Sequence, residues 1–108
     1  MDKETAILVL SALAHETRLS AFQLLVCHEP DGLAAGEVAR LLGVPQNTMS
    51  VHLATLARAG LVRPEKHSRQ KIYRANSKRL STLSLFLIEG CCGGEAELRL
   101  PPLKDSMV

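Results

Sequence analysis

Residues 34–60 have the sequence AAGEVARLLGVPQNTMSVHLATLARAG, which carries the clearest structural pattern in the chain. Apolar residues at helical spacing predict two short helices, Ala34–Leu42 and Pro45–Ala59. Gly43 can take the positive φ that ends a helix, and Pro45 fits the first turn of the next one. The expected buried stripe of the second helix is Met49, Leu53 and Leu56. Two helices with so short a connection predict a helix-turn-helix.

The flanking sequence predicts the rest of a mainly helical domain with one small β-hairpin. β-forming residues on either side of the polar loop His67–Gln70 predict the hairpin. The other expected helices are Thr5–Leu13, Glu16–His28 and Lys78–Glu89, and the expected strands are Leu61–Glu65 and Lys71–Arg74. This order is that of a winged helix-turn-helix, which we expect over residues 1–92, followed by a flexible C-terminal tail over 93–108.

The net charge of +2 on 108 residues conceals an uneven distribution. Residues 45–79 carry eight Lys or Arg and one Glu, whereas the segments on both sides have more acidic than basic residues. A basic block between acidic flanks predicts a nucleic-acid surface. A winged helix that served protein contacts alone would not need this block, and salt-sensitive DNA binding separates the two classes.

The solvent side of the second helix predicts contacts to double-stranded operator DNA in the major groove. Amide side chains can pair with adenine, and small hydroxyl side chains allow close approach to base edges. The candidates are Gln46, Asn47, Thr48, Ser50, Val51 and His52, with helix packing as the alternative for His52. The hairpin candidates for the DNA backbone or a minor groove are Lys66, His67, Arg69 and Lys71.

Several other classes of protein are not indicated. The chain has no apolar run near the roughly 18 residues that span a bilayer, and no signal-peptide pattern at its start. It has no nucleophile–base pair, phosphate loop or paired-carboxylate motif, so we expect neither an enzyme nor a catalytic cofactor. Three cysteines, two of them adjacent, are a poor disulfide framework. We therefore expect a cytoplasmic protein with reduced thiols and no membrane contact.

Three segments resemble the ArsR/SmtB family of winged-helix repressors. Ala12–Leu19 (ALAHETRL) resembles the opening motif of the family, Gln46–Leu53 (QNTMSVHL) its recognition helix, and Leu56–Val62 its exit into the wing. The resemblance covers residues 5–92. It implies a homodimer formed by the first and last helices, an imperfect palindromic operator, and repression relieved by an inducer that is often a metal or metalloid. Pro45 departs from the family's usual Ser, which bears on the helix cap and not on the fold.

The segment Cys91–Gly94 (CCGG) resembles the arsenic-responsive members of this family. The family's Cys-x-Cys site in the third helix is absent, because Ala34 and Gly36 stand at those positions. Leu80–Ile88 offers no Asp, His and Glu set for zinc or nickel. Thiolates select soft acceptors, so the expected inducer is trivalent arsenic (methylarsenite or arsenite) or antimonite, bound at Cys91 and Cys92.

The number of thiols in this site stays open. Arsenite prefers three thiolates and a methylated arsenical needs two, and residues 95–100 contain no third cysteine. Cys27 is a candidate third ligand, although a small buried side chain is the simpler interpretation in an apolar helix. The alternative function is thiol redox or persulfide sensing by the same pair, which a response to peroxide or polysulfide would separate from metalloid sensing.

Overall fold

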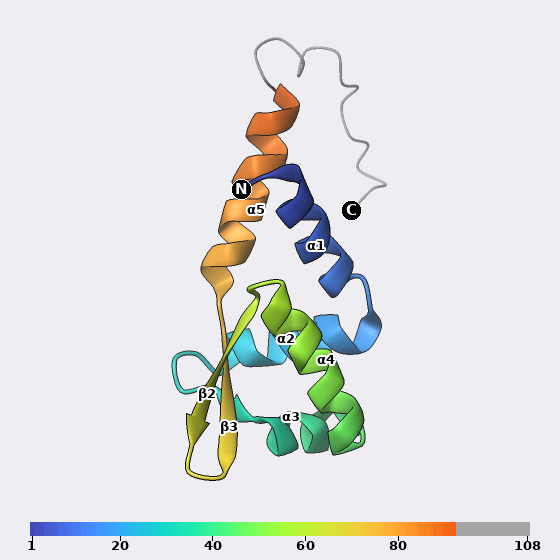
Figure 1. The fold of residues 1–108 in the computed structure, drawn as a ribbon, viewed down its shortest axis with the longest axis vertical. Helices are drawn as coiled ribbons and strands as arrows, with labels where there is room; N and C mark the ends of the chain where they lie inside the picture. The colour runs from blue at the N-terminus through green and yellow to red at the C-terminus, as the bar shows by residue number, and fades with distance from the viewer. Residues whose placement is uncertain (93–108) are drawn as a thin grey trace.

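A computed structural model describes the backbone of residues 1–92 and the side chains of residues 1–89. Helices α2, α3 and α4 and a three-stranded sheet form the body, and α5 rises from it beside α1 (Figure 1). In chain order the elements are α1 (Lys3–Leu13), α2 (Glu16–Cys27), β1 (Leu33–Ala34), α3 (Ala35–Leu42), α4 (Gln46–Arg58), β2 (Val62–His67), β3 (Gln70–Ala75) and α5 (Ser77–Cys92). This is the predicted winged helix-turn-helix. The predicted flexible tail, residues 93–108, lies outside the described residues.

Side chains at the N-caps define where the first two helices begin. Asp2 Oδ1 accepts a hydrogen bond from the Thr5 N–H at 2.8 Å, which satisfies an amide that has no partner within the helix. This hydrogen bond also lowers the pKa of Asp2. At α2, His15 Nδ1 accepts a hydrogen bond from the Thr17 N–H at 3.1 Å. An imidazole therefore does what Ser, Thr, Asp or Asn does at most helix starts.

The turn between α3 and α4 depends on Gly43 and Pro45. Gly43 has a φ of 68°, which a residue without a Cβ adopts at no steric cost. The Val44 N–H then donates to the Ala39 carbonyl at 3.0 Å and closes the end of α3. Pro45 caps α4, and its carbonyl accepts from the Met49 N–H at 2.9 Å. The helix-turn-helix is confirmed, with α4 one residue shorter at each end than predicted.

The wing is a sheet with the strand order β1-β3-β2. Strands β2 and β3 pair in antiparallel register as far as His67 and Gln70. The turn consists of Ser68 and Arg69 alone, so the hairpin is longer than predicted. Ser68 holds a φ of 56° at this turn. The longer hairpin carries its cationic residues further from the body of the protein.

Strand β1 was not predicted. Leu33 pairs with Tyr73, and Ala34 pairs with Ile72. Two residues are too few for the alternating pattern of a strand to be visible, and Ala34 had been assigned to the following helix. The partner strand, which is distant in sequence, decides the conformation here. The strand anchors the start of α3 to the base of the wing.

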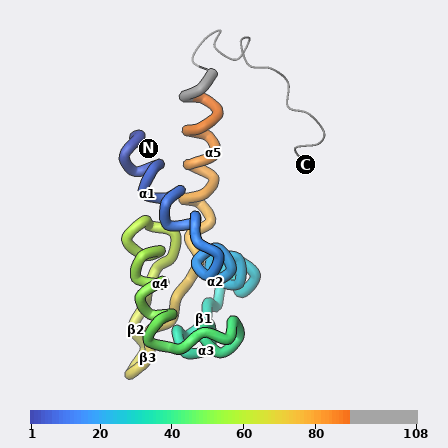
Figure 2. The backbone as a smooth tube through the Cα atoms, turned by 90° about the vertical axis from the view of Figure 1, so that its right-hand side faces the viewer, coloured from blue at the N-terminus to red at the C-terminus, as the bar shows by residue number. Residues whose placement is uncertain are grey.

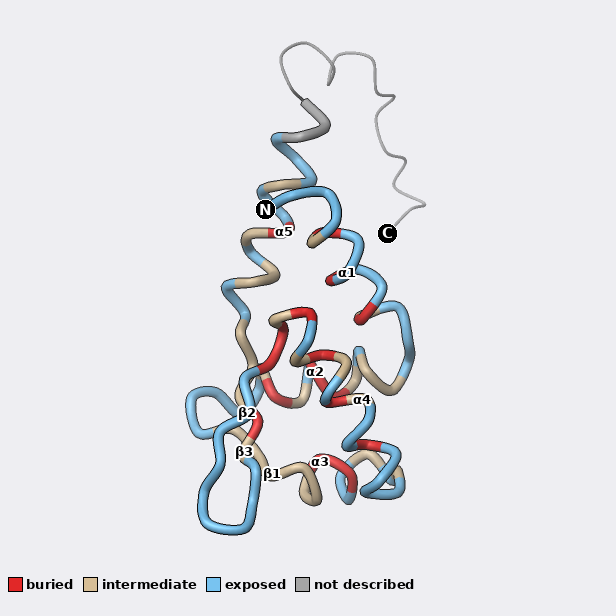
Figure 3. Tube along the Cα trace, in the orientation of Figure 1, coloured by how far each residue is buried: buried red, intermediate tan, exposed pale blue. Residues whose placement is uncertain are grey.

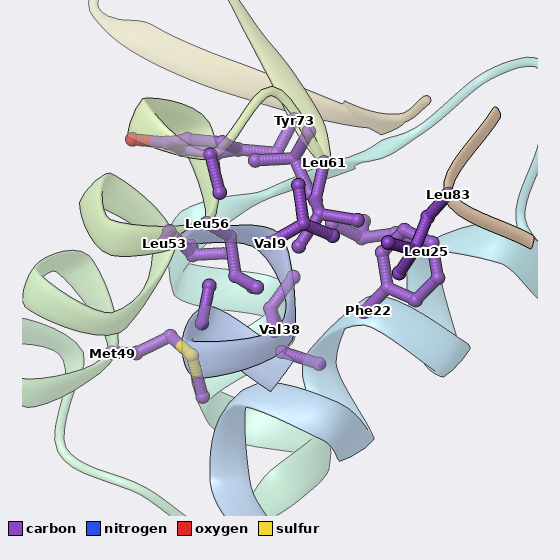
Figure 4. Close-up of a cluster of buried hydrophobic side chains, with 14 of the residues drawn as sticks. Val9, Phe22, Leu25, Val38, Met49, Leu53, Leu56, Leu61, Tyr73 and Leu83 are labelled. Carbon is purple, nitrogen blue, oxygen red and sulfur yellow. The ribbon is translucent and has the colours of Figure 1, made fainter. Parts of the chain in front are cut away.

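The core lies where helices α1 to α4 meet the base of the wing (Figure 4). Met49, Leu53 and Leu56 are fully buried, which confirms the predicted stripe on α4. The side chains gathered around them include Val9, Phe22, Leu25, Val38, Leu61, Tyr73 and Leu83. Because every other element contributes to this cluster, the position of α4 is set by the whole core.

Helices α1 and α5 expose apolar side chains that this core does not cover (Figure 3). Ile7 on α1 is 59% exposed and Ile88 on α5 is 62% exposed. The other exposed apolar side chains on these two helices are Leu8, Leu10, Leu85 and Leu87. A gathering of exposed apolar side chains on two neighbouring helices is typical of an interface. In the part of the chain that the structure describes, no helix combines the length and the apolarity that crossing a bilayer requires.

Helix α5 extends further than predicted. The predicted helix ends at Glu89, before Gly90, whereas the observed helix continues through Gly90 to Cys92. A single glycine costs a helix interior only about 1 kcal/mol relative to alanine, which is too little to end a helix by itself. Cys91 and Cys92 are therefore the last two residues of α5 rather than residues beyond it. Their side chains lie outside the described part of the structure.

Candidate nucleic-acid interface

The solvent-facing side of α4 carries most of the side chains that were predicted to contact bases. Opposite the buried stripe, the exposed candidates are Gln46, Asn47, Thr48, Ser50 and Val51, of which Val51 is 65% exposed. Ala54 continues the same exposed face with a single methyl group. A face built from short and amide-bearing side chains allows the helix axis to approach base edges closely.

A groove of about 560 Å³ lies between α4 and the wing. Gln46 and Ser50 line it on the α4 side, and Arg69 and Lys71 line it on the wing side. Helix α4 and strands β2 and β3 lie on the same side of the molecule (Figure 2). This arrangement suits duplex DNA, with α4 in the major groove and the cationic strand along the backbone.

Gly36, at the start of α3, is a contributor to this groove that the sequence analysis did not assign to it. A Cβ placed on Gly36 would lie 3.2 Å from Oε1 of Gln46, so the Gln46 side chain lies directly over this glycine. A side chain at position 36 would require the end of Gln46 to shift by a few tenths of an ångström. Asn47, the next amide, uses its Oδ1 to accept from the Thr48 N–H at 2.9 Å.

All four wing candidates are exposed: Lys66, His67, Arg69 and Lys71. The wing carboxylate, Glu65, forms an ion pair with Arg74, and its Oε2 lies 3.5 Å from His67 Nε2. Among the side chains of residues 1–89, no carboxylate lies within ion-pair distance of Lys66, Arg69 or Lys71. The three uncompensated cations can therefore bind DNA phosphates, which gives an affinity that depends on salt.

Replacing Arg69 and Lys71 with glutamine is expected to weaken operator binding without changing the preferred sequence. Each phosphate contact that is removed reduces the slope of log affinity against log salt concentration by about one, so the double variant should lose about two. Fluorescence anisotropy at several salt concentrations measures this slope. Lys3→Gln, which removes a charge on α1 away from the groove, is the matched control and should keep the original slope. Equal slopes in both variants would contradict the contact assigned to the wing.

His52 points away from this face. Its side chain is half-buried, and its Nδ1 lies 3.3 Å from Nη1 of Arg18 on α2. Its ring centroid is 4.6 Å from that of His15. The structure therefore favours the packing role for His52 over the predicted base contact. The other candidates on α4 and the wing are exposed, and their contacts to DNA stay predictions.

Cys27, at the end of α2, lies near the start of α5, whereas Cys91 and Cys92 lie at the far end of that helix. Cys27 is exposed at the end of α2, and not buried as expected. Nearby, Ser77 Oγ donates to Glu29 Oε2 at 3.5 Å, so this end of α2 adjoins the start of α5. Cys91 and Cys92 end this 16-residue helix, a rise of about 20 Å along its axis. Cys27 is therefore badly placed to be a third ligand within one protomer.

The described side chains offer no other metal site. Among residues 1–89, no three His, Cys, Asp or Glu side chains lie close enough together to hold a metal ion. The ring of His15 packs on that of His52.

The chain has relatives among transcriptional regulators. A helix-turn-helix domain family matches residues 13–65. The chain is 33% identical over 85 residues to the transcriptional activator HlyU of Vibrio cholerae, which covers 77% of this chain and 76% of that protein. A solved structure of reduced HlyU from Vibrio cholerae has a TM-score of 0.59 at 30% identity, and the match covers 82% of this chain and 90% of that one.

Other solved structures share the fold. An ArsR-like transcriptional regulator from Rhodococcus sp. RHA1 has a TM-score of 0.72 at 27% identity, covering 89% of this chain and 86% of that one. A structure named "possible transcriptional regulator for arsenical resistance" has a TM-score of 0.65 at 27% identity, covering 82% and 88%. The homodimeric DNA-binding domain Mb0332 of Mycobacterium bovis has a TM-score of 0.65 at 22% identity, covering 93% and 89%. The chain therefore belongs to the ArsR family of winged helix-turn-helix transcriptional regulators.

Proposed function

We propose that the chain is a homodimeric repressor that binds operator DNA and is released when trivalent arsenic or antimonite binds Cys91 and Cys92. The observation that carries this proposal is the position of the cysteine pair in the last turn of α5. The same helix exposes Leu85 and Ile88. A ligand at the end of a helix that joins two subunits can change the spacing of their α4 helices, and hence operator affinity.

The proposal of a dimer rests on the uncovered apolar side chains of α1 and α5. A second copy of the chain would bury Ile7 and Ile88 in one continuous interface. It would also present two α4 helices to a palindromic operator, whose half-sites lie one helical turn, about 34 Å, apart. The homodimeric state of Mb0332, which has the same fold, supports this assembly.

The proposal of the inducer rests on the chemistry of two adjacent thiols. Thiolates prefer soft acceptors, and trivalent arsenic and antimony are of that kind. Each As–S bond replaces an As–OH bond and releases one water molecule. Methylarsenite can exchange two hydroxyl groups and needs no third thiol, which matches the pair at Cys91 and Cys92. The similarity to the regulator for arsenical resistance supports the choice of arsenic.

Release from DNA requires that the inducer bind the DNA-free dimer more tightly than the DNA-bound dimer. Couplings between two sites on a protein are typically worth about 5–150-fold in affinity. We therefore expect saturating inducer to weaken operator binding within that range. A tight ligand that bound both states equally would leave the operator occupied.

The Cys91→Ser/Cys92→Ser variant is expected to bind the operator as the parent does and to lose the release by inducer. The measurement is fluorescence anisotropy of the reduced protein on its own upstream DNA, titrated in parallel with methylarsenite, arsenite, antimonite and zinc. Cys27→Ser is the matched control and should respond as the parent does. A double variant that remains fully inducible would refute the proposed site.

The pattern of effective inducers identifies the ligand set. If methylarsenite releases the protein at a concentration well below that at which arsenite does, the result would support a site of two thiolates. Equal release by arsenite and antimonite would imply a third thiolate, and Cys27→Ser would then show whether Cys27 of the partner subunit supplies it. If none of the four releases the protein, the proposal of DNA binding would stand and the proposal of a metalloid inducer would be rejected.

A second candidate function is thiol redox or persulfide sensing by the same pair. The similarity to HlyU, which has been solved in a form named reduced, supports this alternative. Peroxide would oxidise the two thiols to a disulfide and be reduced to two molecules of water. Polysulfide would transfer one sulfur atom to a thiolate, which gives a persulfide and leaves a polysulfide one sulfur shorter. Release by peroxide or polysulfide that is reversed by a thiol reductant, without release by arsenicals, would favour this function.

A further inference from the structure

Three side chains join the recognition helix to the rest of the molecule at a point that the DNA interface does not use. Arg18 on α2 donates from Nε to the Ala12 carbonyl at the end of α1, at 2.7 Å. Its Nη1 lies 3.3 Å from Nδ1 of His52 on α4. The ring of His52 lies against that of His15, with 4.6 Å between centroids and 48° between planes. One guanidinium group therefore bridges α1 and α4.

The directions of these hydrogen bonds determine where the protons are. Arginine has only donors, so Nδ1 of His52 accepts in its contact with Arg18. The backbone N–H of Thr17 is also a donor, so Nδ1 of His15 accepts as well. The His52 ring therefore carries no proton on Nδ1 in this arrangement and is neutral. A proton on that nitrogen would remove the hydrogen bond and add a positive charge beside Arg18.

Among the side chains of residues 1–89, no carboxylate lies within ion-pair distance of the His15 or His52 ring. The charged residues of α1, α2 and α4 besides Arg18 are Lys3, Glu4, Glu16 and Arg58. Lys3 and Glu4 lie in the first turn of α1, at the opposite end from Ala12. Glu16 lines a hollow with Leu42 and Val44, and Arg58 donates to Thr55 Oγ1. Burial, followed by the neighbouring His15 and Arg18, lowers the pKa of His52.

We propose that His15, Arg18 and His52 form an acid-sensitive latch that holds the recognition helix in its DNA-binding position. Arg18 and His15 are positioning residues, because they act on DNA through His52 and α4. When the His52 ring takes up a proton on Nδ1, its hydrogen bond to Arg18 breaks and a positive charge is added beside the guanidinium. The middle of α4 then loses its polar link to α2, and operator affinity falls.

The direction in which operator affinity changes with pH distinguishes the latch from the predicted base contact of His52. The folded-state pKa of His52 is depressed, so the released state binds the proton more readily and the latch weakens as the pH falls below about 6.5. A histidine that touched DNA would do the opposite, because phosphates favour the protonated ring. Wild-type protein with a latch therefore loses affinity on acidification relative to a variant that cannot titrate at position 52.

The test compares wild-type protein with His52→Gln, which can still accept from Arg18 but takes up no proton. Operator affinity is measured by fluorescence anisotropy at pH 7.5 and pH 5.5 at constant ionic strength. A histidine that titrates near 6.5 in the released state can change affinity by no more than about tenfold between these two pH values, so we expect wild type to lose more than His52→Gln, up to about tenfold. His28→Asn, which removes an exposed histidine bonded to the Leu24 carbonyl, is the control and should follow wild type.

Two further variants keep the proposal testable if His52→Gln folds poorly. His15→Asn retains the helix cap, since Asn is a good N-cap, and removes a ring that helps to lower the pKa of His52, so it should reduce the loss of affinity on acidification. Arg18→Lys keeps the charge but replaces the planar fork with a single point donor, and should weaken operator binding about tenfold at pH 7.5. Thermal unfolding between pH 7.5 and 5.5 checks the latch without DNA: wild type should lose more stability than His52→Gln. Parallel pH profiles of wild type and His52→Gln, or a gain of affinity by wild type on acidification, would overturn the latch.

Discussion

The Leu85→Gln/Ile88→Gln variant is expected to be monomeric and to lose specific operator binding. Both side chains are more than half exposed on α5, and in the proposed dimer both enter the interface. Burying two amides without partners opposes association, since each uncompensated amide costs about 1–3 kcal/mol by protein mutational data. Specific sites are bound at least about 10³-fold more tightly than non-specific DNA, so a monomer should lose about that factor.

Light scattering after size-exclusion chromatography measures the oligomeric state, and fluorescence anisotropy measures operator affinity. Leu41→Gln is the matched control, because Leu41 is a similarly exposed leucine (44%) on α3, outside both apolar faces. Glutamine adds no charge, so weaker DNA binding cannot come from repulsion of phosphates. A variant that stays dimeric with full operator affinity would show that α5 does not form the interface.

Replacing Leu53 with alanine is expected to destabilise the protein by about 2–5 kcal/mol. Leu53 is fully buried in the middle of α4, so the substitution removes its contacts and leaves a cavity in the core. A small domain has only about 5–15 kcal/mol of stability in total, so this one change removes a large part of it. Because α4 is also the recognition helix, operator affinity should fall together with stability.

Urea unfolding gives this free energy, provided that every variant is measured at one protein concentration, because a dimer's stability depends on concentration. Val51→Ala is the control on the same helix. Val51 is 65% exposed, so its loss should change stability by no more than about 0.5 kcal/mol. Equal destabilisation by the two variants would mean that α4 does not pack through the stripe containing Leu53.

The helix-turn-helix was predictable because its signals are local. Met49, Leu53 and Leu56 recur at helical spacing, and Gly43 marks the one position between the helices where a positive φ is needed. The hairpin was predicted for the same reason, although β2 continues two residues further, to His67, and β3 begins one residue earlier, at Gln70. The exposed candidates on α4 followed from the buried stripe, because the two lie on opposite sides of one helix.

The errors occurred where local signals were weak or pointed the wrong way. Leu33 and Ala34 form a strand because Tyr73 and Ile72 lie alongside, and no two-residue pattern contains that information. Gly90 looked like the end of α5, but its small cost is outweighed by the rest of the helix. Cys27 looked buried because its neighbours are apolar, whereas its place in the last turn of α2 leaves it exposed.

The chain's periodicity, turn residues and block of positive charge were thus sufficient to predict a winged helix-turn-helix with a DNA-binding face. They could not assign a partner to His52, because Arg18 lies 34 positions away in sequence and reaches His52 only when α2 packs across α4. The same holds for Gly36, whose missing side chain matters only because Gln46 lies over it. Periodicity reports which side of a helix is buried, whereas the identity of the residue that buries it depends on how the helices pack together.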